Sequence, residues 1–143
     1  MSSITSVNAI LMLSITDVFN SPQRLREFST DDIYSVEPVQ VAEVRMGVDG
    51  VLTGGLVNNP RVQNIMLQAD SPSNAVFDAW NAQQQRDQEV YYADMVTTLK
   101  SLGTKWTHTK GILTTFPIIP QGQKVLGPRQ FTITWQSIVP SPT

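Results

Sequence analysis

The feature that most constrains the fold is an Asp-Gly step between β-branched residues, in the stretch Val48-Asp49-Gly50-Val51. Asp-Gly is a strong short-range hairpin signal, because a two-residue type I′ turn needs positive φ at both central positions. Val39 and Val41, and after a shift of one residue Ala42, Val44 and Met46, alternate with polar residues and predict the first strand. Residues 51–57 predict the returning strand, although the pair Gly54-Gly55 weakens it. Residues 62–69 read as a third strand. The sequence therefore predicts an extended hairpin or meander over residues 38–69.

Alternating apolar residues, or segments rich in Thr, Val, Tyr and Trp, predict further strands elsewhere in the chain. These strands are expected at residues 7–16, 90–99 and 105–116 and around residues 131–136. One helix is expected over residues 71–87, because Ser71 can cap the free amides and Pro72 suits the first turn. Its apolar face would carry Val76, Phe77 and Trp80.

Two segments show no period. Residues 18–37 read as a long loop, and the Pro- and Ser-rich residues 139–143 read as a flexible tail ordered only by neighbours. Strands and helices do not alternate as in βαβ units, and no internal repeat is present. We therefore expect one domain over residues 1–143, with a mainly antiparallel β sandwich or barrel and one flanking helix.

Composition excludes several functions. Charged residues make up only 15% of the chain, against roughly 25% in globular proteins, so much of the surface is uncharged and suited to an interface. The absence of cysteine suits assembly in a reducing cytoplasm. A net charge of -2 gives no basic footprint for nucleic acid. The apolar run 9–13 lacks a basic leader and is too short to span a bilayer, so no secretion signal or membrane anchor is expected.

Residues that could carry chemistry are sparse. His108 is the single histidine and lacks a second ligand at metal-binding spacing, so it is expected to be an ordinary sheet-surface or interface residue. Asp31 and Asp32 are adjacent, and in an extended chain they point opposite ways and cannot share a proton. The glycines fit no phosphate-binding pattern. We expect no catalytic residue, cofactor or metal ion, and we expect that the chain is not an enzyme.

Two blocks of sequence carry a family resemblance. The first runs from Val44 to Gly55 (VRMGVDGVLTGG), includes Asn59-Pro60 and continues through residues 65–73 (IMLQADSPS). The second runs from Gly111 (GILT) through residues 128–135 (PRQFTITW). They resemble the inner tail tube proteins of contractile-tailed bacteriophages. The resemblance implies hexameric rings stacked into a hollow tube inside a sheath, with each long hairpin contributing to a continuous inner β barrel.

This reading assigns roles to exposed residues and names partners. The oligomerisation hairpin would comprise Arg45, Met46, Gly47, Val48, Asp49, Gly50 and Val51. Glu43, Asp49 and Gln63 would face the lumen, with Arg45 paired across subunits, and Arg24, Arg26, Asp31 and Asp32 would contact the adjoining ring. The partners would be further copies, the tail sheath, baseplate and tail-terminator proteins, and DNA passing to the host. The protein would assemble in the host cytoplasm and reside in the virion.

Three alternatives stay open. The chain could form a single ring as a baseplate or tail-terminator protein, or it could build the tube of a related injection apparatus. A different class is a monomeric β-sandwich binding module, in which Tyr91, Tyr92 and Trp106 would form a stacking surface for carbohydrate or peptide.

Overall fold

The computed structural model describes residues 9–26, 34–119, 122 and 127–142. Over these ranges the chain forms nine strands, one α-helix and a short 3-10 turn at Lys100–Leu102. In chain order the elements are β1 (Ala9–Ile15), β2 (Phe19–Arg24), β3 (Tyr34–Val36), β4 (Ala42–Met46), β5 (Leu52–Leu56), β6 (Arg61–Leu67), α1 (Asn74–Asp87), β7 (Ala93–Leu99), β8 (Thr104–Thr115) and β9 (Arg129–Pro142). The predicted mainly antiparallel β fold with one helix is confirmed. None of the helices described is long and apolar enough to cross a membrane.

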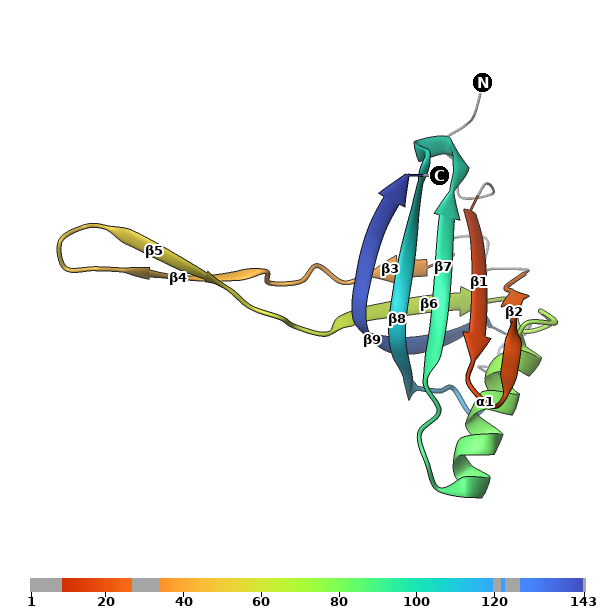
Figure 1. The fold of residues 1–143 in the computed structure, drawn as a ribbon. Coiled ribbons are helices and arrows are strands. Elements are labelled where there is room, and N and C mark those ends of the chain that lie inside the picture. Colours follow the sequence, from red (N-terminus) through yellow and green to blue (C-terminus); the bar gives the residue numbers. More distant parts are fainter. Residues whose placement is uncertain (1–8, 27–33, 120–121, 123–126, 143) are drawn as a thin grey trace.

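Seven strands form one bent antiparallel sheet in the order β2-β1-β7-β8-β9-β6-β3. The long strand β9 joins the two halves of the sheet. Its first half, Arg129 to Trp135, pairs with β6, and its second half pairs with β8 up to Thr104 opposite Pro142. In Figure 1 β6 and β3 run across the direction of β1, β7 and β8. Among the residues that the structure describes, the sheet ends in open edges at β2 and β3, so the expected barrel is not closed there.

The core lies inside the bend and is capped by α1. Apolar residues at every second position of β1 are buried, which is the alternation that predicted this strand. Phe77 of α1 stacks on Phe131 of β9 with ring centroids 4.1 Å apart. Trp80 is fully buried, and its Nε1 donates to the Tyr91 carbonyl at 2.9 Å. The predicted apolar face of the helix is therefore confirmed.

The helix begins at Asn74, three residues later than predicted. Ser71 and Ser73 form a turn before it, in which the Ser71 Oγ accepts from the Ser73 amide at 3.2 Å. The same hydroxyl donates to the Arg26 carbonyl at 2.5 Å, and the Arg26 amide donates to the Ser73 Oγ at 2.7 Å. These two hydroxyls hold the segment around Arg26 against the start of the helix. Ser71 therefore bonds to the turn and to Arg26 and does not cap the helix.

The predicted loop 18–37 is wrong at both ends. Phe19–Arg24 pairs with β1, and Tyr34–Val36 pairs with β6. Both are edge strands with largely exposed side chains, so no apolar alternation marks them in the sequence. Residues 27–33 lie outside the described residues.

The predicted flexible tail 139–143 is also wrong as far as residue 142, because β9 continues to Pro142 and pairs with β8. Beyond Trp135 the strand has no partner on its β6 side. Prolines are tolerated in a strand with an open edge. The two prolines of this segment, Pro140 and Pro142, therefore do not break it.

Candidate functional site

The most unusual feature of the molecule is a two-stranded ribbon that projects far from the body (Figure 1). We call residues 41–57 the assembly arm. Its strands β4 and β5 pair from Ala42 opposite Leu56 to Met46 opposite Leu52 and form a sheet of their own. Every residue of both strands is exposed. An isolated two-stranded ribbon is at best marginally stable in water and leaves both edges unpaired.

The register gives the assembly arm two different faces, because residues directly opposite each other in an antiparallel pair share a face. The apolar face carries Ala42, Val44, Met46, Leu52, Gly54 and Leu56. The polar face carries Glu43, Arg45, Thr53 and Gly55. Val44 is 68% exposed and Leu56 is 91% exposed, so the apolar face is uncovered in the single chain.

The turn at the tip differs from the predicted two-residue type I′ turn. Gly50 has φ +83°, whereas Asp49 does not adopt positive φ. The Gly50 amide donates to the Gly47 carbonyl at 3.0 Å, and the Gly47 amide donates to the Val51 carbonyl at 2.9 Å. The loop therefore spans three residues and needs a left-handed conformation only at its last position, where glycine stands. The Asp49 Oδ1 accepts from the Val51 amide at 3.1 Å and stabilises the turn.

The third strand of the predicted meander does not pair with the arm. Strand β6 pairs with β3 and β9 in the body. This pairing makes the lumen-facing prediction for Gln63 wrong, because Gln63 is fully buried and its Oε1 accepts from the Trp135 Nε1 at 2.8 Å. Gln63 shares its face of β6 with Ile65 and Leu67, which are also fully buried. The step of two between these residues was the signal in the sequence that pointed to burial.

The other predicted site residues lie in two separate places. Glu43 and Asp49 are exposed on the assembly arm. Arg24 and Arg26 are exposed at and just after β2 in the body, so the structure does not bring them to the arm. Asp31 and Asp32 lie outside the described residues. Facing the lumen and contacting another ring stay predictions for these side chains.

His108 was predicted to lie at the surface of the sheet, and this is wrong. The residue is 2% exposed, its Nε2 lies 3.0 Å from the Thr97 Oγ1, and its ring meets Trp135 edge-on with centroids 4.9 Å apart. Burial lowers the pKa of His108 to about 4, so the imidazole is neutral near pH 7. Lys110 has φ +52° at a register shift, which lets His108 and Gly111 both face inward.

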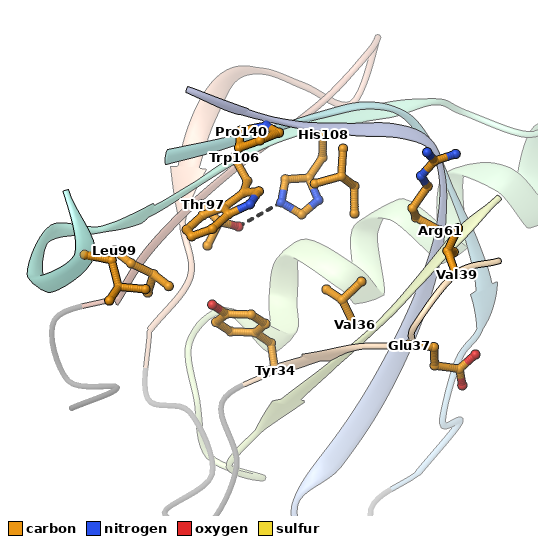
Figure 2. Close-up of a pocket in the computed structure, with 12 residues that line it drawn as sticks. Tyr34, Val36, Glu37, Val39, Arg61, Thr97, Leu99, Trp106, His108 and Pro140 are labelled. Carbon is orange, nitrogen blue, oxygen red and sulfur yellow. Dashed lines mark hydrogen bonds between the residues drawn. The ribbon is translucent and has the colours of Figure 1, made fainter. Parts of the chain in front are cut away.

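An apolar cleft of about 500 Å³ lies between β3 and the ends of β7, β8 and β9 (Figure 2). Its walls include Tyr34, Val36, Leu99, Leu102, Trp106, His108 and Pro140, and it also touches Glu37 and Arg61. Burial raises the pKa of Tyr34 above its usual value. This cleft could not be predicted from the sequence, because its lining residues come from five strands that are distant in the chain.

The structure does not support the stacking surface proposed for a binding module. Trp106 lines the apolar cleft opposite Thr97, whereas Tyr91 and Tyr92 precede the other end of β7. The Tyr91 hydroxyl bonds to Asp87 of the helix. These three aromatic rings therefore form no common platform.

Comparisons with known proteins place this fold. The family described as tail fiber protein gp32 matches residues 2–139. A comparison with curated proteins gave no match. A chain of the anti-feeding prophage tube-terminating cap is similar in fold, with 12% identity, coverage of 100% of this chain and 93% of that chain, and a TM-score of 0.63. A chain of the anti-feeding prophage baseplate shows 17% identity, coverage of 99% and 97%, and a TM-score of 0.60.

A third solved structure has a similar fold. A chain of the sheath-tube complex of the extracellular contractile injection system PVC, in the extended state, has 12% identity, coverage of 99% of this chain and 93% of that chain, and a TM-score of 0.59. At these identities the likeness shows a shared fold. Together with the family match it confirms the predicted phage contractile-tail protein and its place in the virion. The chain belongs to the tail fiber protein gp32 family and is a structural component of a phage tail.

Proposed function

We propose that this tail protein is the subunit of a tail tube, in which six copies close into a ring and the rings stack into a conduit. The observation that supports the proposal is the assembly arm, which carries one apolar and one polar face and is exposed on both. A monomer gains nothing by holding such a ribbon in water. In a ring, the arm edges of neighbouring copies pair with each other, so that no edge is left open.

The two faces of the assembly arm indicate its orientation in a ring. The apolar face would be buried against protein, because obligate interfaces resemble the interior of a domain. The polar face would then line the channel and present Glu43, Arg45 and Thr53 to water. Asp49, at the tip, would add a second carboxylate. Glu43 and Arg45 are two residues apart on one strand, so the charges alternate along this lining.

Electrostatics favours a conduit for nucleic acid that does not bind its cargo. Double-stranded DNA carries one negative charge per roughly 1.7 Å of helix axis, so a cationic lumen would hold it and slow ejection. A ring of six chains would carry a formal charge of -12, six times the -2 of one chain. We propose that carboxylates on the polar face keep DNA from binding to the wall of the channel. The sheath would surround the tube, and baseplate and terminator proteins would close its ends.

Electron microscopy of the purified protein tests the proposal. Long hollow filaments at high protein concentration are the expected result, and deletion of residues 42–56 should leave a folded monomer, because all ten strand residues of the arm are exposed. A wild-type protein that remains monomeric at high concentration by light scattering would refute the proposal. We infer a structural role and no enzymatic activity.

The second candidate is a subunit that forms a single ring, such as a tail terminator or a baseplate component. The similar folds include chains from a tube-terminating cap and a baseplate, so the fold alone does not separate these roles. The same micrographs distinguish them, because a terminator or baseplate ring should stop growing at one ring.

A further inference from the structure

We propose that the apolar cleft of one copy receives the loop tip Ile118–Ile119 of a copy in the adjoining ring. The inference rests on the proposed stacking of rings and adds the contact that holds one ring to the next. Two features of the described residues support it. The first is the acceptor, which is the open apolar cleft near the start of β8. The second is the exposed pair Ile118–Ile119 beyond the end of β8, which we call the knob.

The acceptor has the size and chemistry for apolar side chains. At about 500 Å³ the cleft lies within the range of pockets that enclose whole ligands. Leu102 is 58% exposed and Val36 is 40% exposed on its walls. Figure 2 shows Trp106 and Tyr34 turned toward the same space, with Glu37 and Arg61 on one side of it. Apolar surface that a soluble monomer leaves open in this way marks an interaction site.

The chain that leads into the knob is held in place. Ile118 is 84% exposed and Ile119 is 76% exposed. The Pro117 carbonyl that precedes them accepts from the Arg129 Nη2 at 2.9 Å. The same Arg129 nitrogen donates to the Asp78 Oδ1 at 3.0 Å, so the base of the loop is fixed to both β9 and α1. A segment held in place before binding loses little conformational entropy when it docks.

The knob and the cleft lie at opposite ends of the body. Trp106 and His108 of the cleft stand near the start of β8, and Ile118 follows its end at Thr115. Trp106 and His108 lie nine and seven residues before Thr115, which is roughly 23–30 Å of extended strand, so the knob and the cleft do not meet within one chain. A knob at one end and an acceptor at the other give a head-to-tail contact, which continues from ring to ring when the rotation between copies does not close it.

The cleft is continuous with the assembly arm. Val36 and Val39 line it, and the chain passes directly from them to Val41, which is 60% exposed at the root of the arm. The root of the assembly arm, which the proposed contacts within a ring would cover, therefore borders the cleft, which we assign to the contact between rings. This continuity favours a second copy of the same chain as the occupant of the cleft.

Disulfide trapping tests the contact sharply, because the chain has no cysteine of its own. We would oxidise assembled Leu102→Cys/Ile118→Cys protein and run it on a non-reducing gel. A disulfide needs Cβ atoms roughly 3.5–4.5 Å apart, so it forms only where a knob reaches a cleft. The expected result is a covalent ladder that continues beyond six chains. Val36→Cys/Ile118→Cys provides a second acceptor position, and Val48→Cys/Ile118→Cys is the matched control that should form no ladder.

The outcomes separate this inference from the proposed function. Tubes that form but give no ladder with either acceptor would overturn the inference and leave the tube intact. A ladder that stops at six chains would place the contact within a ring and would also overturn it. Wild-type protein that forms no tubes would refute the proposed function and the inference with it.

A charge pair gives a second readout. Leu102→Glu and Ile118→Lys should each raise the protein concentration needed for tube growth by roughly tenfold or more, since each leaves an unpaired charge in an apolar contact. Both side chains are largely exposed, so the variants should fold as the wild type does. The double variant should restore growth by pairing the two charges. Additive losses in the double variant would refute direct contact between the two positions.

Discussion

Replacing Val44 and Leu56 with threonine should raise the protein concentration needed for tube growth and leave the fold intact. Both residues lie on the apolar face of the assembly arm, at 68% and 91% exposure. Fully burying such a side chain is worth roughly 1.5–3 kcal/mol, and threonine is a β-branched residue that suits a strand. We scale this burial free energy by the exposed fraction of each side chain and allow for the methyl group that threonine keeps. The two substitutions together then weaken the addition of each subunit by about 2 kcal/mol. Each 1.4 kcal/mol is a tenfold change, so the critical concentration should rise roughly 30-fold.

Sedimentation of assembled from unassembled protein over a concentration series measures this shift directly. Thermal unfolding of the unassembled protein should be unchanged, because both side chains lie outside the buried core cluster. The matched control is Glu43→Gln/Arg45→Gln on the polar face of the same strand. This variant removes two charges that face water in the proposed ring, so it should assemble at close to the wild-type concentration.

Two results would refute the reasoning. If the threonine variant assembled at the wild-type concentration, the apolar face would not be buried in the assembly. If the glutamine control lost assembly as strongly as the threonine variant, then the two faces would not differ in their surroundings. In that case the orientation proposed for the arm would be wrong even though the arm itself was required.

Three further predictions follow from the body and the lumen. Burial lowers the pKa of His108 to about 4, so the unfolded chain binds the proton at a higher pH than the folded chain does. The free energy of unfolding should therefore fall by up to about 3 kcal/mol as the pH drops from 6.5 toward 4. Urea titrations should show this fall in the wild type and not in His108→Gln. Gly111→Ala should destabilise the fold by roughly 1–3 kcal/mol or more in chemical denaturation, since its Cβ would lie 2.5 Å from the Trp135 ring. Glu43→Lys with Asp49→Lys should leave tubes visible but slow genome delivery in an ejection assay, and unchanged ejection kinetics would refute the lumen assignment.

The sequence predicted the parts of the fold that depend on local pattern. Alternation located β1, and a high content of Thr, Val, Tyr and Trp located β7 and β8. The helical spacing of Val76 and Trp80 located the inner face of α1. The edge strands β2 and β3 were missed, because a strand with two exposed faces needs no apolar residue at any fixed position. The hairpin tip was located correctly, but its turn type was wrong, since Gly50 alone supplies the positive φ.

Register across the sheet was the part that local pattern could not supply. The two-residue step to Ile65 and Leu67 places Gln63 on the inner face of β6, but only Trp135, 72 residues away, supplies the indole N–H that satisfies its buried oxygen. His108 looks exposed until the bulge at Lys110 turns it toward Thr97. A polar side chain in a core is stable only with its partner in place. Errors of this kind therefore gather at buried polar residues, whose environment is set by pairings that are distant in the chain.

The assembly arm is the reverse case, and this is why a function could be proposed from the residues. Its pairing is local, so the alternation of Val44 and Met46 with Glu43 and Arg45 would give the same two faces in any chain that forms this hairpin. No described residue of the body covers the apolar face of the arm, so another molecule must cover it if it is to be buried. A local pattern with no partner inside the fold thus predicts an intermolecular contact. Within the body, by contrast, the apolar faces predicted for β1, α1 and the first half of β9 pack against each other in the core.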